Sequence, residues 1–301
     1  MAKKLSDLPV RIGVNPIVWS NDDFHDLGGD IPLERCLSEI HAAGYAGTEL
    51  GHKYPRDPRL LAPLLRAHEL ELVSGWHSLH LLERPFEEEA REYLRHLDLL
   101  ALLRSRVVIV AECSRRLYDD PATSLQFDGW SDTLSPPEWT QLTTGLEKLA
   151  EMAAARGLRL VYHHHMGTVI QSEADIDELM QRTHDTGLLA DTGHLAFAGI
   201  EPLSVLRRHA QRIAHVHLKS VRPEIVRRAE EGTWSFAYAV RQGVFTVPGD
   251  GGIDFEPIFA QLAEASYRGW LVVEAEQDPA VAPPLRCAEA ARAYIRRTTG
   301  L

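Results

Sequence analysis

Four short segments in the second half of the chain carry side chains that commonly bind divalent metal ions. They hold His163-His164-His165, Asp191, His215 with His217, and Glu274 with Glu276. Histidines mixed with carboxylates are typical ligands of Mn, Co, Fe or Zn and suit Mg or Ca poorly. One such histidine is more often a hydrogen-bonded polar group than a ligand, but four successive segments of this composition indicate a metal centre. A bound divalent ion acts as a Lewis acid, so the chemistry to expect is polarisation of a substrate oxygen.

Each of these segments lies at the end of a short apolar run, as in RLVYH, GLLAD, IAHVHL and WLVVE. Runs of this kind form strands that are buried on both faces of a parallel sheet. Eight of them recur along the chain, and they end near Asn15, Glu49, Trp76, Val110, His163, Asp191, His217 and Glu274. The four metal-binding segments therefore end four consecutive strands.

Amphipathic helical segments separate the strands. Ser172, three residues before Asp175, predicts a helix N-cap, and Gly44 predicts the end of another helix. Alternating strands and helices over 301 residues predict an α/β fold, a (β/α)8 TIM barrel that forms a single domain over residues 1–301. An open doubly wound sheet is the alternative, but residues 15–24 (NPIVWSNDDF) lack the glycine-rich phosphate loop that usually follows its first strand.

Strand alternation limits which of the candidate ligands can act together. His163 and His165 lie on one face of their strand and His164 on the other. Two further pairs share a face in the same way, His215 with His217 and Glu274 with Glu276. In each pair one member is expected to bind the ion and the other to lie beside it. Whether His163 or His165 is the ligand stays open at this point.

Two connections, at about residues 112–137 and 221–252, are too long for simple turns. Both follow strands, so they lie at the C-terminal face, where barrel enzymes place their active sites. The second contains Trp234, Phe236 and Tyr238, an aromatic set that suits a lid over the site. A structural flap and a subunit contact, which would imply a homo-oligomer, are the alternatives.

The bulk composition excludes several kinds of partner. The formal net charge of −11 argues against nucleic acid or an anionic membrane, because such binding depends on Lys and Arg. Cys36, Cys113 and Cys287 form no CxxC pair and suit a reducing compartment. No run approaches the ~18 apolar residues of a membrane-spanning helix, and the N-terminus lacks an apolar signal segment. The sequence therefore predicts a cytoplasmic enzyme that acts on a small molecule.

These motifs resemble those of the xylose isomerase-like TIM barrels and, more closely, those of the inosose dehydratases of myo-inositol catabolism. The matching segments spread over nearly the whole chain: NPIVWSNDD (15–23), GTELG (47–51), YHHHMGTVIQ (162–171), DTGH (191–194), HVHLK (215–219), FTVPGDG (245–251) and VVEAEQDP (272–279). YHHHMGT and VVEAEQDP are long enough to be specific, unlike DxGH alone.

The resemblance implies roles for individual residues. It makes Asp191, His217 and Glu274 metal ligands. It places His163 where the wider superfamily has its first ligand Glu, and His165 where the dehydratases have a catalytic histidine. It further implies Mn or Co as the metal and an association with glutathione, for which the sequence holds no recognisable site.

The activity that the resemblance implies is the metal-dependent dehydration of 2-keto-myo-inositol (scyllo-inosose), a cyclic keto-polyol, to a trihydroxycyclohexane-1,2-dione. In this hydro-lyase reaction we expect His165 to remove the α-proton and Lys219 to assist the leaving hydroxyl. An orienting role for His165, and an ion pair of Lys219 with Glu49 or Glu276, are the alternatives.

Other polar residues at the expected catalytic face are candidates to bind substrate. Glu49 and Glu112 end their strands, and His194 follows the predicted ligand Asp191 by three residues. Ser220 departs from the family, which usually has Asp after the lysine of HxHxK, and this difference bears on substrate selection.

Three other functions compete with dehydration. A keto-sugar epimerase or isomerase normally keeps a carboxylate where this chain has His163. A phosphodiesterase of the endonuclease IV type needs further ligands, including one after the seventh strand, and residues 222–253 contain no histidine. An inactive barrel that serves as a sugar-binding module is the third.

Overall fold

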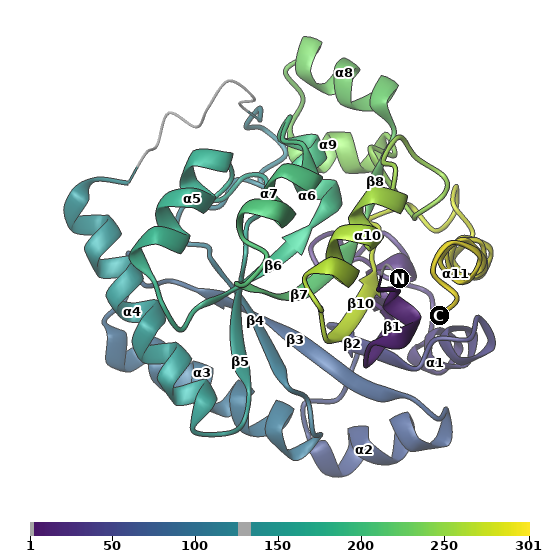
Figure 1. Ribbon diagram of the computed structural model, residues 1–301, viewed down its shortest axis with the longest axis horizontal. Helices are drawn as coiled ribbons and strands as arrows, with labels where there is room; N and C mark the ends of the chain where they lie inside the picture. Colours follow the sequence, from purple (N-terminus) through teal and green to yellow (C-terminus); the bar gives the residue numbers. More distant parts are fainter. Residues whose placement is uncertain (1–2, 126–133) are drawn as a thin grey trace.

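In the computed structural model, which describes residues 3–125 and 134–301, eight parallel strands close into a barrel, as predicted (Figure 1). Around the barrel they lie in the order β1-β10-β7-β6-β5-β4-β3-β2, and β1 closes against β10 from Val10 beside Gly269 to Val14 beside Val273. The barrel strands are β1 Val10–Val14, β2 Gly47–Leu50, β3 Glu71–Leu79, β4 Val107–Glu112, β5 Arg159–His163, β6 Gly187–Asp191, β7 Ile213–Leu218 and β10 Gly269–Val273.

Helices cover the outside of the barrel (Figure 1). They are α1 Leu33–Ala42, α2 Pro58–Ala67, α3 Phe86–Leu102, α4 Pro136–Ala154, α5 Glu173–Arg182, α6 Thr192–Phe197, α7 Pro202–Arg208, α10 Glu256–Glu264 and α11 Pro284–Thr299, with short 3-10 turns η1 Leu5–Asp7 and η2 Pro16–Val18. The Ser172 side chain accepts a hydrogen bond from the Asp175 backbone and caps α5. Gly44, with a φ of 82°, follows the end of α1. Both helix boundaries match the sequence prediction.

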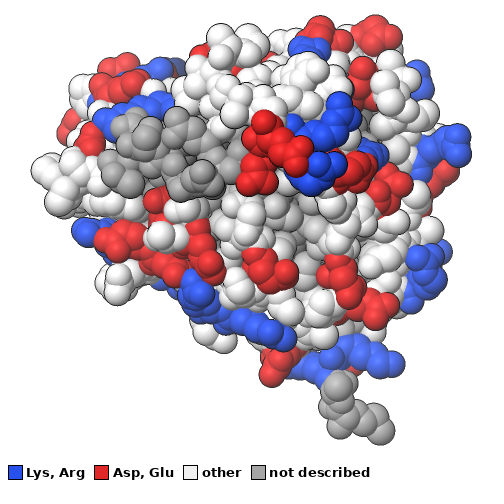
Figure 2. All heavy atoms as spheres, turned by 90° about the horizontal axis from the view of Figure 1, so that it is seen from above, with Lys and Arg blue, Asp and Glu red and all other residues white. Residues whose placement is uncertain are grey.

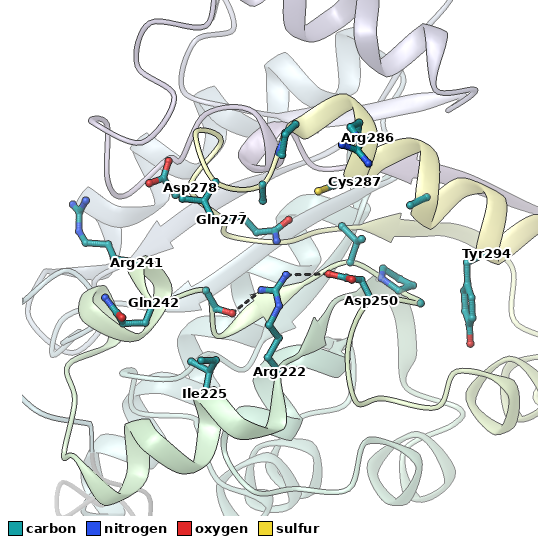
Figure 3. Close-up of a pocket in the computed structure, with 18 of the residues that line it drawn as sticks. Arg222, Ile225, Arg241, Gln242, Asp250, Gln277, Asp278, Arg286, Cys287 and Tyr294 are labelled. Atoms are coloured by element: carbon teal, nitrogen blue, oxygen red, sulfur yellow. Dashed lines mark hydrogen bonds and ion pairs between the residues drawn. The ribbon is translucent and has the colours of Figure 1, made fainter.

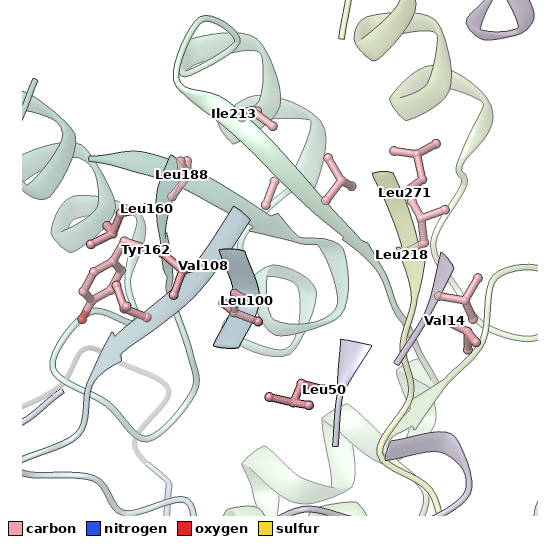
Figure 4. Close-up of a cluster of buried hydrophobic side chains, with 14 of the residues drawn as sticks. Val14, Leu50, Leu100, Val108, Leu160, Tyr162, Leu188, Ile213, Leu218 and Leu271 are labelled. Carbon is pink, nitrogen blue, oxygen red and sulfur yellow. The ribbon is translucent and has the colours of Figure 1, made fainter. Parts of the chain in front are cut away.

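Two sets of apolar side chains alternate along the strands. Val108 and Leu160 belong to the large core between strands and helices (Figure 4). Ile109 and Val161, one residue further along, belong to a smaller cluster on the opposite face, inside the barrel. His163 follows Val161 by two residues, so it continues this inward row at the C-terminal end of β5.

The second long connection contains structure of its own. It consists of α8 (Pro223–Glu231), α9 (Phe236–Arg241) and a two-stranded antiparallel ribbon of β8 (Ser220–Val221) with β9 (Phe245–Thr246). Figure 1 shows α8 and α9 on the same side of the barrel as α6. The first connection touches it, because the Leu125 backbone N–H donates to Trp234 O at 2.9 Å. Residues 126–133 of the first connection lie outside the described part.

On the face that Figure 2 shows, acidic and basic side chains are interspersed among the described residues. This pattern, with the net charge of −11, does not favour a polyanionic partner. Among the described helices, none combines the length and apolar character needed to cross a membrane.

At the N-terminal end of the barrel, the ring of Trp270 packs against a small residue. A β carbon added at Gly47 would lie 2.8 Å from Val73 Cγ2 and 2.9 Å from Trp270 Cη2. The Arg11 guanidinium lies 4.2 Å from the centre of the Trp270 ring on β10. The barrel is therefore tightly packed around Gly47.

We predict that Gly47→Ala destabilises the protein without changing its chemistry. The added methyl group overpacks the barrel floor, and such changes cost about 1–3 kcal/mol. The candidate site lies at the opposite end, so metal content and turnover of the folded variant should equal those of the unmodified protein. Thermal unfolding measures the first effect, and an unchanged melting temperature would contradict the packing argument.

Candidate metal centre and active site

Asp191 lies at the centre of the predicted metal site. It ends β6, and its Oδ1 accepts backbone hydrogen bonds from Gly193 (2.8 Å) and His194 (2.9 Å), which caps α6. These two hydrogen bonds fix the orientation of the carboxylate, and Oδ2 takes no part in the helix cap. Three groups surround Oδ2, each at 3.4 Å: His163 Nε2, His217 Nδ1 and Lys219 Nζ.

These separations fit a bound metal ion better than direct hydrogen bonds. Two ligand atoms that each lie about 2.0–2.2 Å from one tetrahedral ion are about 3.4 Å apart. Asp191 Oδ2 and His217 Nδ1 are buried, and within the described part of the chain neither has a hydrogen-bond partner. Glu274 Oε2 lies 2.8 Å from His217 Nδ1. A divalent ion between these atoms would satisfy polar groups that the protein alone leaves unsatisfied.

The structure distinguishes between the two histidines that share the inward face of β5. His163 Nδ1 lies 2.6 Å from the His164 carbonyl oxygen, so it donates there and leaves the Nε2 lone pair toward Asp191. His163 thus groups with Asp191 and Glu274, whereas His165 groups with other residues. This arrangement favours His163 as the strand-5 ligand.

A second histidine competes with His217 for the fourth place. His194 also comes within 4.8 Å of the His163, Asp191 and Glu274 ligand atoms. Its Nδ1, however, accepts the Met166 backbone N–H at 3.3 Å. His217 Nδ1 lies closer to both carboxylates, and we therefore favour His217, as the sequence predicted.

Glu49 holds His217 in this orientation. Its Oε1 lies 3.2 Å from His217 Nε2, 2.8 Å from His215 Nε2 and 2.5 Å from Ser74 Oγ. Burial opposes its ionisation, but the His217 charge holds the pKa of Glu49 well below its ordinary value. A carboxylate that hydrogen-bonds the far nitrogen of a ligating histidine fixes the ring and its tautomer. Glu49 lines the cavity, but its oxygens are already engaged by protein groups.

Asn15 was not singled out as a site residue from the sequence, although it ends a predicted strand. Its Nδ2 donates to Glu49 Oε2 at 2.8 Å and to Glu274 Oε2 at 2.9 Å. Asn15 thereby links the predicted ligand Glu274 to Glu49, whose carboxylate contacts His217. The signal available was its place at the end of β1, at the same face as the ligands.

Lys219 lies behind the metal centre rather than in the cavity. It is fully buried, and its Nζ lies 2.6 Å from Glu274 Oε1 and 2.9 Å from Glu276 Oε2. Burial works against its charge, but Asp191 and Glu274 raise its pKa above the ordinary value. The ion pair with Glu276, one of the alternatives from the sequence, is the arrangement observed, and Lys219 is not among the described residues that line the cavity.

His165 faces the cavity as a neutral imidazole. Its Nδ1 lies 2.7 Å from the Met166 carbonyl oxygen, so this nitrogen donates and Nε2 keeps a lone pair. Burial, with the neighbouring charges of His163 and Lys219, lowers its pKa well below the ordinary value. Its ring packs beside Tyr118, with ring centres 4.7 Å apart.

Two residues predicted to contact substrate have other surroundings. The Glu112 carboxylate accepts backbone hydrogen bonds from Leu81 (2.8 Å) and Ser114 (2.9 Å), because it caps the chain after β4. His194 is buried beneath the His165 ring, with ring centres 3.9 Å apart. Neither belongs to the described lining of the cavity.

Ser220, where the family usually has Asp, packs under the loop after β9 and not in the cavity. Its Oγ accepts the Ile253 backbone N–H at 3.3 Å, and a β carbon at Gly251 would lie 2.3 Å from it. A larger side chain here would displace this loop. The departure therefore bears on loop packing rather than on direct contact with substrate.

The cavity at the barrel mouth has a volume of about 80 Å³. Its lining consists of Asn15, Ile17, Asp22, Asp23, Glu49, Leu50, Trp76, Ile109, Tyr118, His163, His165, His217, Glu274 and Glu276. Phe236 of α9 packs on this group, with its ring centre 5.3 Å from that of His165. Trp234 and Tyr238 instead pack against each other, 4.8 Å apart. Of the three predicted lid aromatics, Phe236 covers the site.

A larger cavity of about 620 Å³ lies between α11 and the segment from α8 to β9 (Figure 3). Arg222, Asp250, Gln277 and Cys287 are among its lining residues. None of the predicted catalytic or metal-binding residues belongs to its described lining, so the cavity at the barrel mouth is the candidate active site.

Comparison with known proteins identifies the family of this chain over nearly its whole length. Residues 37–298 match the xylose isomerase-like TIM barrel family. Inosose dehydratase of Geobacillus thermodenitrificans is 47% identical over 97% of this chain and 98% of its own length, and that of Clostridium botulinum 45% over the same shares. The chain belongs to the inosose dehydratases of this barrel family. The rhizopine catabolism protein MocC of Rhizobium meliloti is also 47% identical, over 96% of this chain and 89% of its own.

Solved structures resemble this dehydratase family member in fold alone. An L-ribulose 3-epimerase structure has a TM-score of 0.68 at 20% identity and covers 97% of this chain and 95% of its own. The probable 3-DHS dehydratase AsbF of Bacillus anthracis has a TM-score of 0.67 at 14% identity and covers 95% of this chain and 98% of its own.

We predict that Asp191→Asn and Glu274→Gln each lower the metal content of the purified protein while the barrel stays folded. Each substitution removes a negative charge at the atoms that would hold the ion. Elemental analysis after dialysis, with circular dichroism for folding, makes the measurement. Glu224→Gln, on the exposed side of α8, is the control. If both variants retain metal as well as the control does, another residue set binds it.

Proposed function

We propose that this chain dehydrates 2-keto-myo-inositol and releases a trihydroxycyclohexane-1,2-dione in inositol catabolism. The observation that carries the proposal is the 43–47% identity to several inosose dehydratases over 97% of the chain. The site geometry is compatible with it, because a neutral histidine, a buried ligand cluster and a small cavity meet at one point. MocC, at the same identity as the first of these relatives, supports a compound of rhizopine catabolism as the second candidate substrate.

We propose His163, Asp191, His217 and Glu274 as the residues that would hold the metal, with Mn or Co favoured because both suit histidine and carboxylate together. When bound, the ion would supply Lewis acidity to the substrate carbonyl. Two carboxylates and two neutral histidines leave the charge of a divalent ion balanced, whereas a third carboxylate would make the site negative. The site should therefore favour polarisation of a ketone.

His165 is the base in this proposal. It faces the cavity from the same strand as His163, and its Nδ1 donation to Met166 leaves Nε2 as the acceptor. Burial keeps the imidazole neutral at physiological pH, so it is ready to accept the proton next to the carbonyl. Trp76, Tyr118 and Phe236 surround it and exclude water from the reacting atoms.

A keto-sugar epimerase, the rival within the superfamily, is less well supported. Such an enzyme normally keeps a carboxylate where this chain has His163, and the epimerase structures share only about a fifth of their residues with it. The partner in this proposal is a small keto-polyol. Homo-oligomerisation and glutathione remain predictions from sequence and resemblance, and the free cysteines suit a cytoplasmic location.

Removal of the metal should abolish activity. We expect protein treated with EDTA to be inactive toward 2-keto-myo-inositol, with Mn or Co restoring turnover better than Mg because the ligands include imidazoles. Appearance of the dione, followed by its ultraviolet absorbance, makes the measurement. Full activity of the stripped protein, or a clear preference for Mg, would contradict the proposed site.

His165→Gln should separate metal binding from proton abstraction. Glutamine keeps similar bulk but is too weak a base, so turnover should fall about 10²–10⁴-fold while metal content stays the same. Exchange of the substrate α-proton in deuterium oxide should also be lost, which nuclear magnetic resonance detects. Exchange at the original rate would rule out His165 as the base, and loss of the metal would make it a ligand.

A further inference from the structure

Dehydration needs an acid as well as a base, because hydroxide is a poor leaving group. Under the proposed function, on which this inference rests, some group must protonate the departing oxygen. Lys219 does not line the cavity and is engaged by Glu274 and Glu276. The acid must therefore come from the residues that face the cavity.

Most proton-bearing groups of the cavity are already committed. Trp76 Nε1 donates to Ser78 Oγ at 2.9 Å, and the Tyr118 hydroxyl lies 3.7 Å from Cys113 Sγ. Burial raises the pKa of Tyr118 far above its ordinary value, which makes it a weak acid.

The cavity carboxylates are also engaged, with one exception. Glu49 accepts several hydrogen bonds, Glu274 belongs to the ligand cluster, and protonation of Glu276 would break its ion pair with Lys219. Asp22 Oδ1 accepts the His52 backbone N–H at 3.0 Å and lies 2.7 Å from His52 Nδ1. Asp23 is the carboxyl group that is left.

Asp23 is held at the cavity by its own backbone. Asn21 Oδ1 accepts hydrogen bonds from the backbone N–H groups of Asp23 (2.8 Å) and Phe24 (2.7 Å), and Asn21 is completely buried. The turn is thus fixed from below while the Asp23 side chain lines the cavity. No hydrogen bond or ion pair to the Asp23 carboxyl group occurs among residues 3–125 and 134–301.

The surroundings of Asp23 favour its protonated form. Asp23 is exposed at the cavity mouth. Loss of hydration of its carboxyl group, together with the charges of Asp22 and Asp119, raises its pKa to about 7. Arg116 and Lys219 act in the opposite direction. Contact with solvent allows the group to take up a proton again after each turnover.

We propose that Asp23 is the catalytic acid that protonates the leaving β-hydroxyl group. His165 takes the α-proton, and the electron pair of that C–H bond forms the enolate. The enolate pair then forms the carbon–carbon double bond as the β-carbon–oxygen bond breaks, and the Asp23 proton joins the departing oxygen to give water. Asp23 regains its proton from solvent. When the enol becomes the dione, the proton on His165 is transferred to the former β-carbon, and the enol hydroxyl group releases its own proton to solvent.

A substrate whose leaving group departs without being protonated tests this role. In an analogue of 2-keto-myo-inositol with fluorine in place of the β-hydroxyl group, fluoride departs as an anion. Asp23→Asn should lower kcat on the natural substrate about 10²–10⁴-fold, and leave kcat on the fluoro analogue within about threefold of the unmodified enzyme. Exchange of the α-proton in deuterium oxide should persist. Asp26→Asn, an exposed aspartate of the same loop paired with Arg241, is the matched control and should behave as the unmodified enzyme on both substrates.

The two proposals fail in different ways. If the unmodified enzyme neither dehydrates the natural substrate nor eliminates fluoride from the analogue, the proposed function is wrong. If it acts on both, and Asp23→Asn loses activity equally on both, Asp23 binds substrate or maintains structure and is not the acid. Unchanged activity of the variant on the natural substrate would also overturn the assignment. Turnover of the fluoro analogue by the variant shows at once that it is folded.

Discussion

Burial of four carboxylates in one place is the constraint on which the site depends. Glu49, Asp191, Glu274 and Glu276 are each at most 5% exposed at the barrel mouth. Removing ionised carboxylates from water is costly unless opposite charges and hydrogen bonds compensate. Lys219 supplies positive charge, and Asn15 and Ser74 donate hydrogen bonds to Glu49. A divalent ion beside Asp191 Oδ2 would neutralise the remaining negative charge. The burial of these carboxylates is therefore explained if the cluster binds a metal ion.

The barrel provides this arrangement through strand alternation. Apolar residues lie below two of the predicted ligands in their inward rows, since Val161 precedes His163 by two residues and Leu189 precedes Asp191 by two. Asp191 belongs to two structures at once, because one carboxylate oxygen caps α6 and the other faces the ligands. The direction of the α6 cap therefore decides where the ion can bind.

The sequence was sufficient for the fold and for the composition of the site. Eight short apolar runs that alternate with helical segments predicted the barrel, and the residue types at the strand ends predicted that His163, Asp191, His217 and Glu274 lie together. The individual hydrogen bonds between side chains of different strands could not be predicted, because the sequence pattern of one strand carries no information about its partners.

The residues of the first half of the chain show this limit most clearly. Asn15 has the polarity of many strand-end residues, and only the closure of β1 against β10 brings it beside Glu274. Glu112 lies near the C-terminal end of its strand, as Glu49 does, but its carboxylate accepts hydrogen bonds from the backbone instead of facing the site. The metal ligands come from the second half of the barrel, whereas the proposed acid comes from the loop after β1. Closure of the barrel brings the proposed acid Asp23 and the proposed base His165 into the lining of one cavity, so one bound substrate could meet both.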